Sequence, residues 1–228
     1  PPFSARSRVM EYGGKPYVAG HGRIVFSNFV DQRLYVMPLN ETCGPRPLTP
    51  ERSADDRLLK FMQPEFSPDG RWLLAACELE NGSEEPQNAV CVLDLELEGI
   101  QEPVIIASGA DLYRSPMFAP DGRSVAWLEW NHPYMPWDST VLKVAPFHEG
   151  RLENGAVQHV AGSNSVAISD FVFSPTGDLW FLMDMKGAAP ESAENFFNLY
   201  EWHDGAVRQI TAEAREISML AQPDRRLA

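Results

Sequence analysis

The sequence predicts an all-β protein: a partial β-propeller of about four complete four-stranded antiparallel blades, followed by the start of another. Three observations lead to this prediction. A turn containing proline and glycine recurs along the chain, a nearly continuous apolar run follows each copy, and two further strand-like segments follow each run. Internal repeats of roughly 50 residues are typical of propellers and solenoids.

The recurring turn predicts a tight β-hairpin. Its three copies are Phe66–Arg71, Phe118–Arg123 and Phe173–Asp178. In each copy the proline presets the backbone for a type I turn, and the glycine takes the left-handed position that closes the hairpin. The apolar runs that follow are Trp72–Cys77, Val125–Leu128 and Leu179–Met183. A strand is continuously apolar when both faces of its sheet are covered, as they are in stacked blades.

The spacing of these elements sets approximate blade boundaries. We expect blades at residues 16–49, 64–107, 116–161 and 171–212, with residues 218–228 beginning the next one. The first blade has a degenerate turn, Gly20–Gly22. An open run of blades leaves apolar faces uncovered. We therefore expect further blades in the full protein, or partner chains such as a second copy in a homo-oligomer, to cover those faces.

Composition narrows the classes of partner and cofactor. The formal net charge of −13, with no basic stripe, argues against nucleic acid. No apolar run is long enough to span a bilayer, so no membrane contact is expected. The five histidines are scattered and the three cysteines have no metal-ligand spacing, so we expect no metal and no cofactor. Cys77 and Cys91 could pair across a hairpin, but their apolar flanks favour buried thiols and a cytoplasmic location.

Three longer segments go beyond a generic propeller. They are Arg6–Gly14, Phe26–Tyr35 and Trp130–Thr140. Together they resemble the propeller of the prolyl oligopeptidase family of serine peptidases, in its acylaminoacyl-peptidase and dipeptidyl aminopeptidase-like branch. The resemblance covers nearly the whole chain, but blade four departs from the family pattern at Asp184–Gly187.

The resemblance implies that catalysis resides elsewhere in the parent protein. In the family, a C-terminal α/β-hydrolase domain supplies a Ser-Asp-His triad, and the propeller restricts access to short peptides. This sequence contains no G-x-S-x-G nucleophile motif. We therefore expect no catalytic residue here, an inactive chain when isolated, and a hydrolase domain and short peptides as partners.

Candidate binding residues lie in the loops between the second and third strands and in the segment before the first blade. These loops share one face of a propeller, which is the usual arrangement for a binding surface. His132, Trp137 and Asp138 could hold a peptide amine through an aromatic wall and a carboxylate. Alternatively, Trp137 is a packing lid and Asp138 caps a turn. Arg8 and Glu11 could bind a substrate carbonyl, or form a structural ion pair between blades.

Two other functional classes remain open at this stage. The chain could be a stand-alone propeller that acts as a protein-interaction scaffold, as TolB-like propellers do. It could also be a propeller enzyme with its own metal site, which would need at least three histidines to converge at the ring centre.

Overall fold

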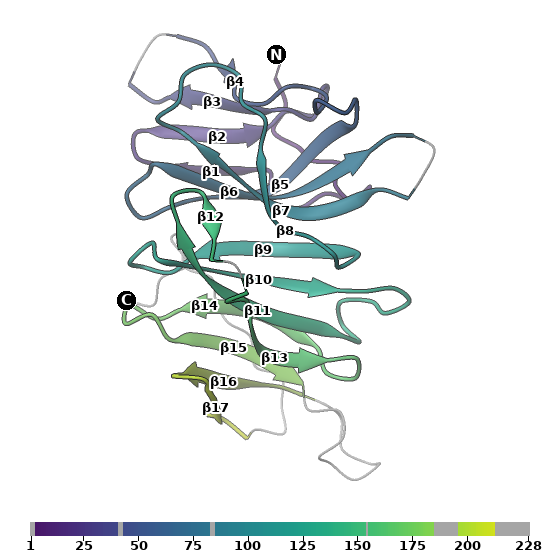
Figure 1. The fold of residues 1–228 in the computed structure, drawn as a ribbon, viewed down its shortest axis with the longest axis vertical. Coiled ribbons are helices and arrows are strands. Elements are labelled where there is room, and N and C mark those ends of the chain that lie inside the picture. Colours follow the sequence, from purple (N-terminus) through teal and green to yellow (C-terminus); the bar gives the residue numbers. More distant parts are fainter. Residues whose placement is uncertain (1–2, 41–42, 83–84, 154, 185–195, 213–228) are drawn as a thin grey trace.

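Four antiparallel sheets are stacked one after another in the computed structural model, which describes residues 3–40, 43–82, 85–153, 155–184 and 196–212 (Figure 1). We call these sheets blades 1 to 4. Blade 1 holds β1 (Tyr17–Gly20), β2 (Arg23–Ser27), β3 (Leu34–Pro38) and β4 (Arg46–Pro47). Blade 2 holds β5 (Leu58–Phe66), β6 (Trp72–Glu80), β7 (Gln87–Asp94) and β8 (Val104–Ala107).

The other two blades repeat this order. Blade 3 holds β9 (Leu112–Phe118), β10 (Ser124–Trp130), β11 (Thr140–His148) and β13 (Gln158–Ser163), and the short β12 (Arg151–Leu152) pairs with the far end of β11. Blade 4 holds β14 (Ile168–Phe173), β15 (Leu179–Asp184), β16 (Phe197–His203) and β17 (Ala206–Gln209). The predicted partial propeller is thereby confirmed. Residues 218–228, which the sequence assigns to a further blade, lie outside the described residues.

The recurring turn forms as its residues require. The glycine amide donates to the carbonyl of the first turn residue three times: Gly70 to Ser67 at 2.9 Å, Gly122 to Ala119 at 2.9 Å, and Gly177 to Ser174 at 3.0 Å. All three glycines have positive φ, between 73° and 95°. These turns lie on the left of Figure 1, and the β6–β7 and β10–β11 connections lie on the right. We call the two sides the turn face and the loop face.

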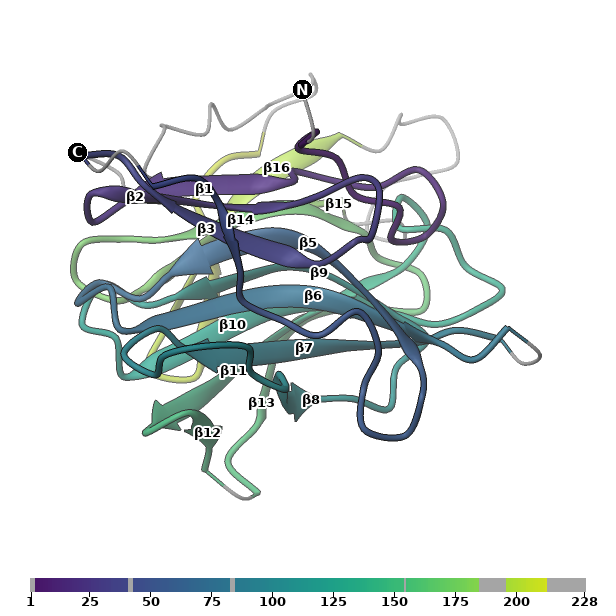
Figure 2. The ribbon, with the colours of Figure 1, turned by 90° about the horizontal axis from the view of Figure 1, so that it is seen from above.

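Apolar side chains fill each gap between neighbouring blades. Along β6, Leu73, Ala75 and Cys77 pack against blade 1, while Leu74 packs against blade 3. Both faces of this strand are therefore buried, which explains its uninterrupted apolar sequence. Figure 1 shows the sheets stacked in chain order, and the view from above shows them lying over one another (Figure 2).

Cys77 and Cys91 are buried thiols in the core between blades 1 and 2, as the sequence predicts. A hydrogen bond with Cys77 and burial raise the pKa of Cys91 well above its ordinary value. Since the thiolate is the reactive form, Cys91 is unreactive at neutral pH.

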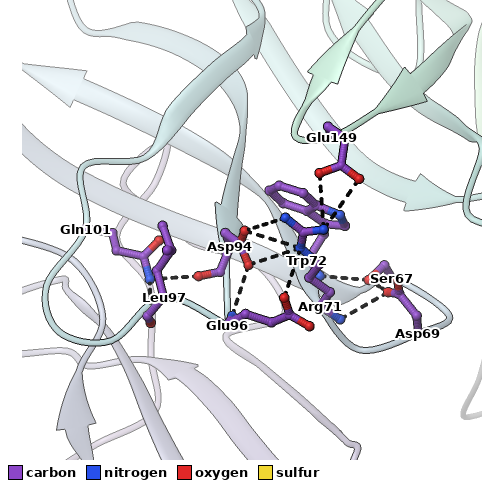
Figure 3. A network of polar contacts seen from close by, with 9 residues as sticks. All are labelled: Ser67, Asp69, Arg71, Trp72, Asp94, Glu96, Leu97, Gln101 and Glu149. Carbon is purple, nitrogen blue, oxygen red and sulfur yellow. Dashed lines mark hydrogen bonds and ion pairs between the residues drawn. The ribbon is translucent and has the colours of Figure 1, made fainter.

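A polar network on the turn face joins blades 2 and 3 (Figure 3). The Arg71 guanidinium lies 4.5 Å above the Trp72 ring, and its Nη2 donates to Asp94 Oδ2 at 3.0 Å. Its Nη1 also pairs with Glu149 Oε2 of blade 3 at 3.1 Å. The network thus fixes the spacing of the two blades at the turn face.

A second charged pair on the turn face gives a testable pH dependence. Asp178 accepts a hydrogen bond from the His203 ring, and this bond, followed by the charge of Asp204, raises the pKa of His203 above its ordinary value. The stabilisation is therefore complete below the unfolded-state pKa and is lost as pH rises through the raised folded-state value. We expect an NMR titration to show Asp178→Asn lowering the pKa of His203, and Asp204→Asn lowering it less. An unchanged pKa in Asp178→Asn would contradict this pairing.

Within the described residues, no helix combines the length and apolar character needed to cross a membrane.

Candidate functional site

A cleft of about 900 Å³ opens between blades 2 and 3 on the loop face. Five parts of the chain contribute most of the lining: the segment before β1, the start of β5 with the residue before it, the facing ends of β6 and β7, the β8–β9 connection and the β10–β11 loop. We call it the inter-blade cleft. The lining residues important for its chemistry are Glu11, Tyr12, Lys60, Glu78, Asp111 and His132.

The lining of the inter-blade cleft is acidic. Its carboxylates are Glu11, Glu78, Glu80, Glu85 and Asp111, and its permanent cations are Arg57 and Lys60. Arg57 is already paired with Asp55 at 2.7 Å. A concave site with an excess of one charge sign concentrates ligands of the opposite sign. The cleft therefore favours a cationic ligand.

Lys60 forms an ion-pair cluster with two glutamates of the neighbouring strand. Its Nζ lies 2.5 Å from Glu78 Oε1 and 2.6 Å from Glu80 Oε2. Burial is the largest single influence on Lys60 and lowers its pKa, but the hydrogen bonds to the two glutamates outweigh it. The pKa of Lys60 is therefore raised, and the ammonium stays charged.

The segment before β1 crosses the rim of the cleft in a tight turn. Val9 is buried against Met62 and Ala76, and it anchors the turn to blade 2. The amide of Gly13 donates to the Val9 carbonyl at 2.9 Å and closes the turn. At its tip the Tyr12 side chain is 76% exposed. The turn thus presents a carboxylate, that of Glu11, beside an aromatic ring.

The β10–β11 loop forms the opposite rim through contacts with the β8–β9 connection. The His132 amide donates to Asp111 Oδ2, and the Asp111 amide donates to Asn131 Oδ1, both at 2.8 Å. Asn88 Nδ2 donates to the Asp111 carbonyl at 2.8 Å. Asp111 is therefore held by both blades, and it positions the loop that carries Tyr134.

The structure brings together only some of the predicted site residues. Glu11 and His132 line the inter-blade cleft from opposite rims, whereas Arg8, Trp137 and Asp138 do not line it. The structure describes both Arg8 and Glu11 and places no ion pair between them. Instead, the Arg8 guanidinium stacks on Phe29 at 4.2 Å.

The other two predicted residues lie beyond the cleft in the same loop. The Trp137 side chain is 59% exposed, and the Asp138 amide donates to the Met135 carbonyl at 2.9 Å. The predicted roles of Trp137 and Asp138 in binding remain predictions.

Sequence reasoning missed Lys60, Glu78 and Asp111. Lys60 and Glu78 are directly opposite in the β5–β6 register, and opposite charges at facing positions are a usual sheet contact. That signal becomes visible only once the register of the hairpin is known. No group of three or more His, Cys, Asp or Glu side chains in the described ranges could hold a metal ion.

Neither a protein-family model nor a curated protein matches the sequence. Among solved structures, the chain is similar to puromycin hydrolase, with a TM-score of 0.78 and 27% identity over 93% of this chain and 33% of that one. It is also similar to a puromycin-hydrolyzing peptidase of Mycobacterium tuberculosis, with a TM-score of 0.75, 28% identity and the same coverage. The chain thus spans about a third of the length of these proteins.

More distant structures share the fold alone. Prolyl oligopeptidase B of Galerina marginata matches with a TM-score of 0.56 and 14% identity, over 86% of this chain and 28% of that one. TolB of Acinetobacter baumannii matches with a TM-score of 0.51 and 14% identity, over 91% of this chain and 43% of that one. The four stacked blades and these similarities lead to one conclusion: the chain has the fold of the β-propeller portions of puromycin hydrolase and prolyl oligopeptidase B.

Proposed function

We propose that this chain is the non-catalytic, substrate-gating part of a larger serine peptidase that acts on short peptides and aminoacyl amides. The single observation that carries the proposal is the acidic inter-blade cleft on the loop face. Its two rims are formed by Arg6–Gly14 and Trp130–Thr140, the segments whose sequences resemble the family. The cleft has the volume of a small-molecule or short-peptide site.

The lining suits a ligand with an ammonium group beside an aromatic side chain. Carboxylates such as Glu11 accept charge-assisted hydrogen bonds from an amine. Tyr12 and Tyr134 provide rings for stacking and for cation–π contacts. Puromycin, which the similar enzymes hydrolyse, combines a free α-amine with an aromatic side chain. It is therefore a suitable probe of this cleft.

We propose that the loop face also meets the hydrolase domain of the same protein. Large apolar side chains remain exposed there: Val30 at 75%, Met135 at 46% and Trp137 at 59%. Exposed apolar groups among polar neighbours are typical of interaction surfaces. A domain in this position would confine substrates to those small enough to enter, which would exclude folded proteins.

The experiment compares the product of the complete reading frame with the 228-residue chain alone, on puromycin and on N-acetylpuromycin. We expect only the complete product to hydrolyse them. Glu11→Gln should raise KM for puromycin about tenfold, as the loss of one charge-assisted hydrogen bond to an amine implies. KM for N-acetylpuromycin, which has no ammonium group, should stay unchanged.

Glu98→Gln is the matched control, since it removes the same charge from an exposed residue outside the cleft. Hydrolysis by the isolated chain would refute the proposal. So would an equal effect of Glu11→Gln and Glu98→Gln.

The second candidate is a stand-alone, TolB-like scaffold propeller, favoured by the shared fold alone. A reading frame that continues into a G-x-S-x-G-bearing α/β domain would decide against it. We also propose a cytoplasmic location, because neighbouring cysteines that stay unpaired, as Cys77 and Cys91 do, are typical of proteins in a reducing compartment.

A further inference from the structure

The turn at the rim of the inter-blade cleft contains two strained residues in succession. Met10 and Glu11 have φ values of 53° and 64°. In this left-handed region the Cβ of an L-residue crowds its own backbone, which makes the conformation unfavourable at both residues. Such a conformation persists only where its surroundings hold it in place.

Glu78 of blade 2 holds the Met10–Glu11 turn in this conformation. Its Oε2 accepts the Met10 amide at 2.7 Å, and its Oε1 is paired with Lys60 Nζ at 2.5 Å. The Glu78 side chain is only 5% exposed. Both carboxylate oxygens are therefore engaged, one by the strained turn and the other by a buried cation.

A buried ion pair adds little to stability, because removing two charges from water offsets most of their attraction. The geometry of this pair has a clearer consequence. Lys60 holds the carboxylate in one orientation, and the carboxylate then determines where the Met10 amide lies. Glu11 and Tyr12 follow directly in the chain, so their positions depend on the same contact.

We propose that Glu78 is the positioning residue of the inter-blade cleft, which sets the affinity for cationic ligands by holding the Met10–Glu11 turn so that Glu11 faces the cleft. The inference rests on the proposed function, because it identifies what controls amine recognition in the same site. Glu78 belongs to the cleft lining, but because Met10 and Lys60 already engage its two carboxylate oxygens, we expect it to act on the ligand through Glu11.

The first test measures the turn directly, in the protein expressed from its complete reading frame. Glu78→Gln keeps the size of the side chain and an acceptor oxygen but removes the charge. We expect amide hydrogen exchange at Met10–Gly13 to become at least about tenfold faster, since the charged hydrogen bond is lost. Exchange within Ala89–Leu93 of β7 should remain unchanged. An unchanged rate at Met10–Gly13 would overturn the proposal.

Glu80→Gln is the matched control for this measurement. Glu80 pairs with Lys60 as Glu78 does, but the Met10 amide donates to Glu78. We therefore expect Glu80→Gln to leave exchange at Met10–Gly13 at the wild-type rate. Equal acceleration by both variants would show that the Lys60 cluster merely supports blade 2, and would also overturn the proposal.

The second test asks whether Glu78 acts through Glu11. We expect Glu78→Gln to raise KM for puromycin about tenfold with kcat unchanged, and to have no further effect in a protein that already carries Glu11→Gln. Independent effects that multiply in the double variant would refute the proposed route. If KM for puromycin does not depend on Glu11 at all, the proposed function fails, and the exchange measurement alone decides whether Glu78 holds the turn.

Discussion

Replacement of Gly162 by alanine is expected to lower the free energy of unfolding by more than about 3 kcal/mol. Gly162 lies opposite Val141 in the β11–β13 pair and has a φ of 93°. A Cβ at this position would lie 1.9 Å from the Thr140 carbonyl oxygen and 3.0 Å from the Val141 Cα. These are backbone atoms of a central strand, so the crowding is relieved only if the two strands move apart. Chemical denaturation followed by circular dichroism measures the loss.

Gly177→Ala separates crowding from backbone strain. Gly177 has nearly the same φ, 95°, but a Cβ there would meet no atom within 4 Å. Gly177→Ala should therefore lower the free energy of unfolding by only about 1 kcal/mol, which is the strain of an alanine in the left-handed region. Equal losses in the two variants would show that the approach to Thr140 is unimportant.

Trp127→Ala is expected to lower the free energy of unfolding by about 3–5 kcal/mol. The Trp127 side chain is 1% exposed and lies in the core between blades 2 and 3 with Leu74 and Tyr113. Its removal leaves a large cavity that the rigid neighbouring sheets cannot fill. Its Nε1 also donates to Glu129 Oε2 at 2.8 Å. Trp127→Phe retains a ring and should lower the free energy of unfolding by about 1–2 kcal/mol, mainly because the hydrogen bond is lost.

Trp180→Ala is the control for this effect. Trp180 also donates from Nε1 to a glutamate, Glu201, at 3.1 Å, but its side chain is only partly buried. We expect Trp180→Ala to lower the free energy of unfolding by less than half as much as Trp127→Ala does. A comparable loss at Trp180 would mean that the hydrogen bond to glutamate, and not core packing, dominates at both positions.

The sequence located the second strand of each later blade best, because the turn before it is defined by local chemistry. The first strands are harder to place from sequence. β5 begins at Leu58, whereas the repeat places the start of that blade near residue 64. Lys60, Gln63 and Glu65 interrupt its apolar pattern. Its pairing with β6 is also irregular between Met62 and Glu65, where Gln63 has a positive φ.

The same irregularity explains why part of the cleft escaped prediction. Counted back from the turn at Gly70, a regular hairpin would place Phe61, not Lys60, opposite Glu78. The actual register, Lys60 opposite Glu78, follows from the bulge. Glu11 and His132 were found because family-like segments carry them. Trp137 and Asp138 are close to His132 in sequence, but they are not part of the cleft lining.

The contrast between the two ends of the blades has a consequence for how this architecture can diversify. On one side, proline–glycine hairpins join the first two strands of blades 2 to 4, and the Arg71 contacts with Asp94 and Glu149 join blade 2 to blade 3. On the other side, the connections contribute the cleft lining. Substitutions and length changes in those connections can therefore alter the lining of the cleft while the contacts that stack the blades are kept.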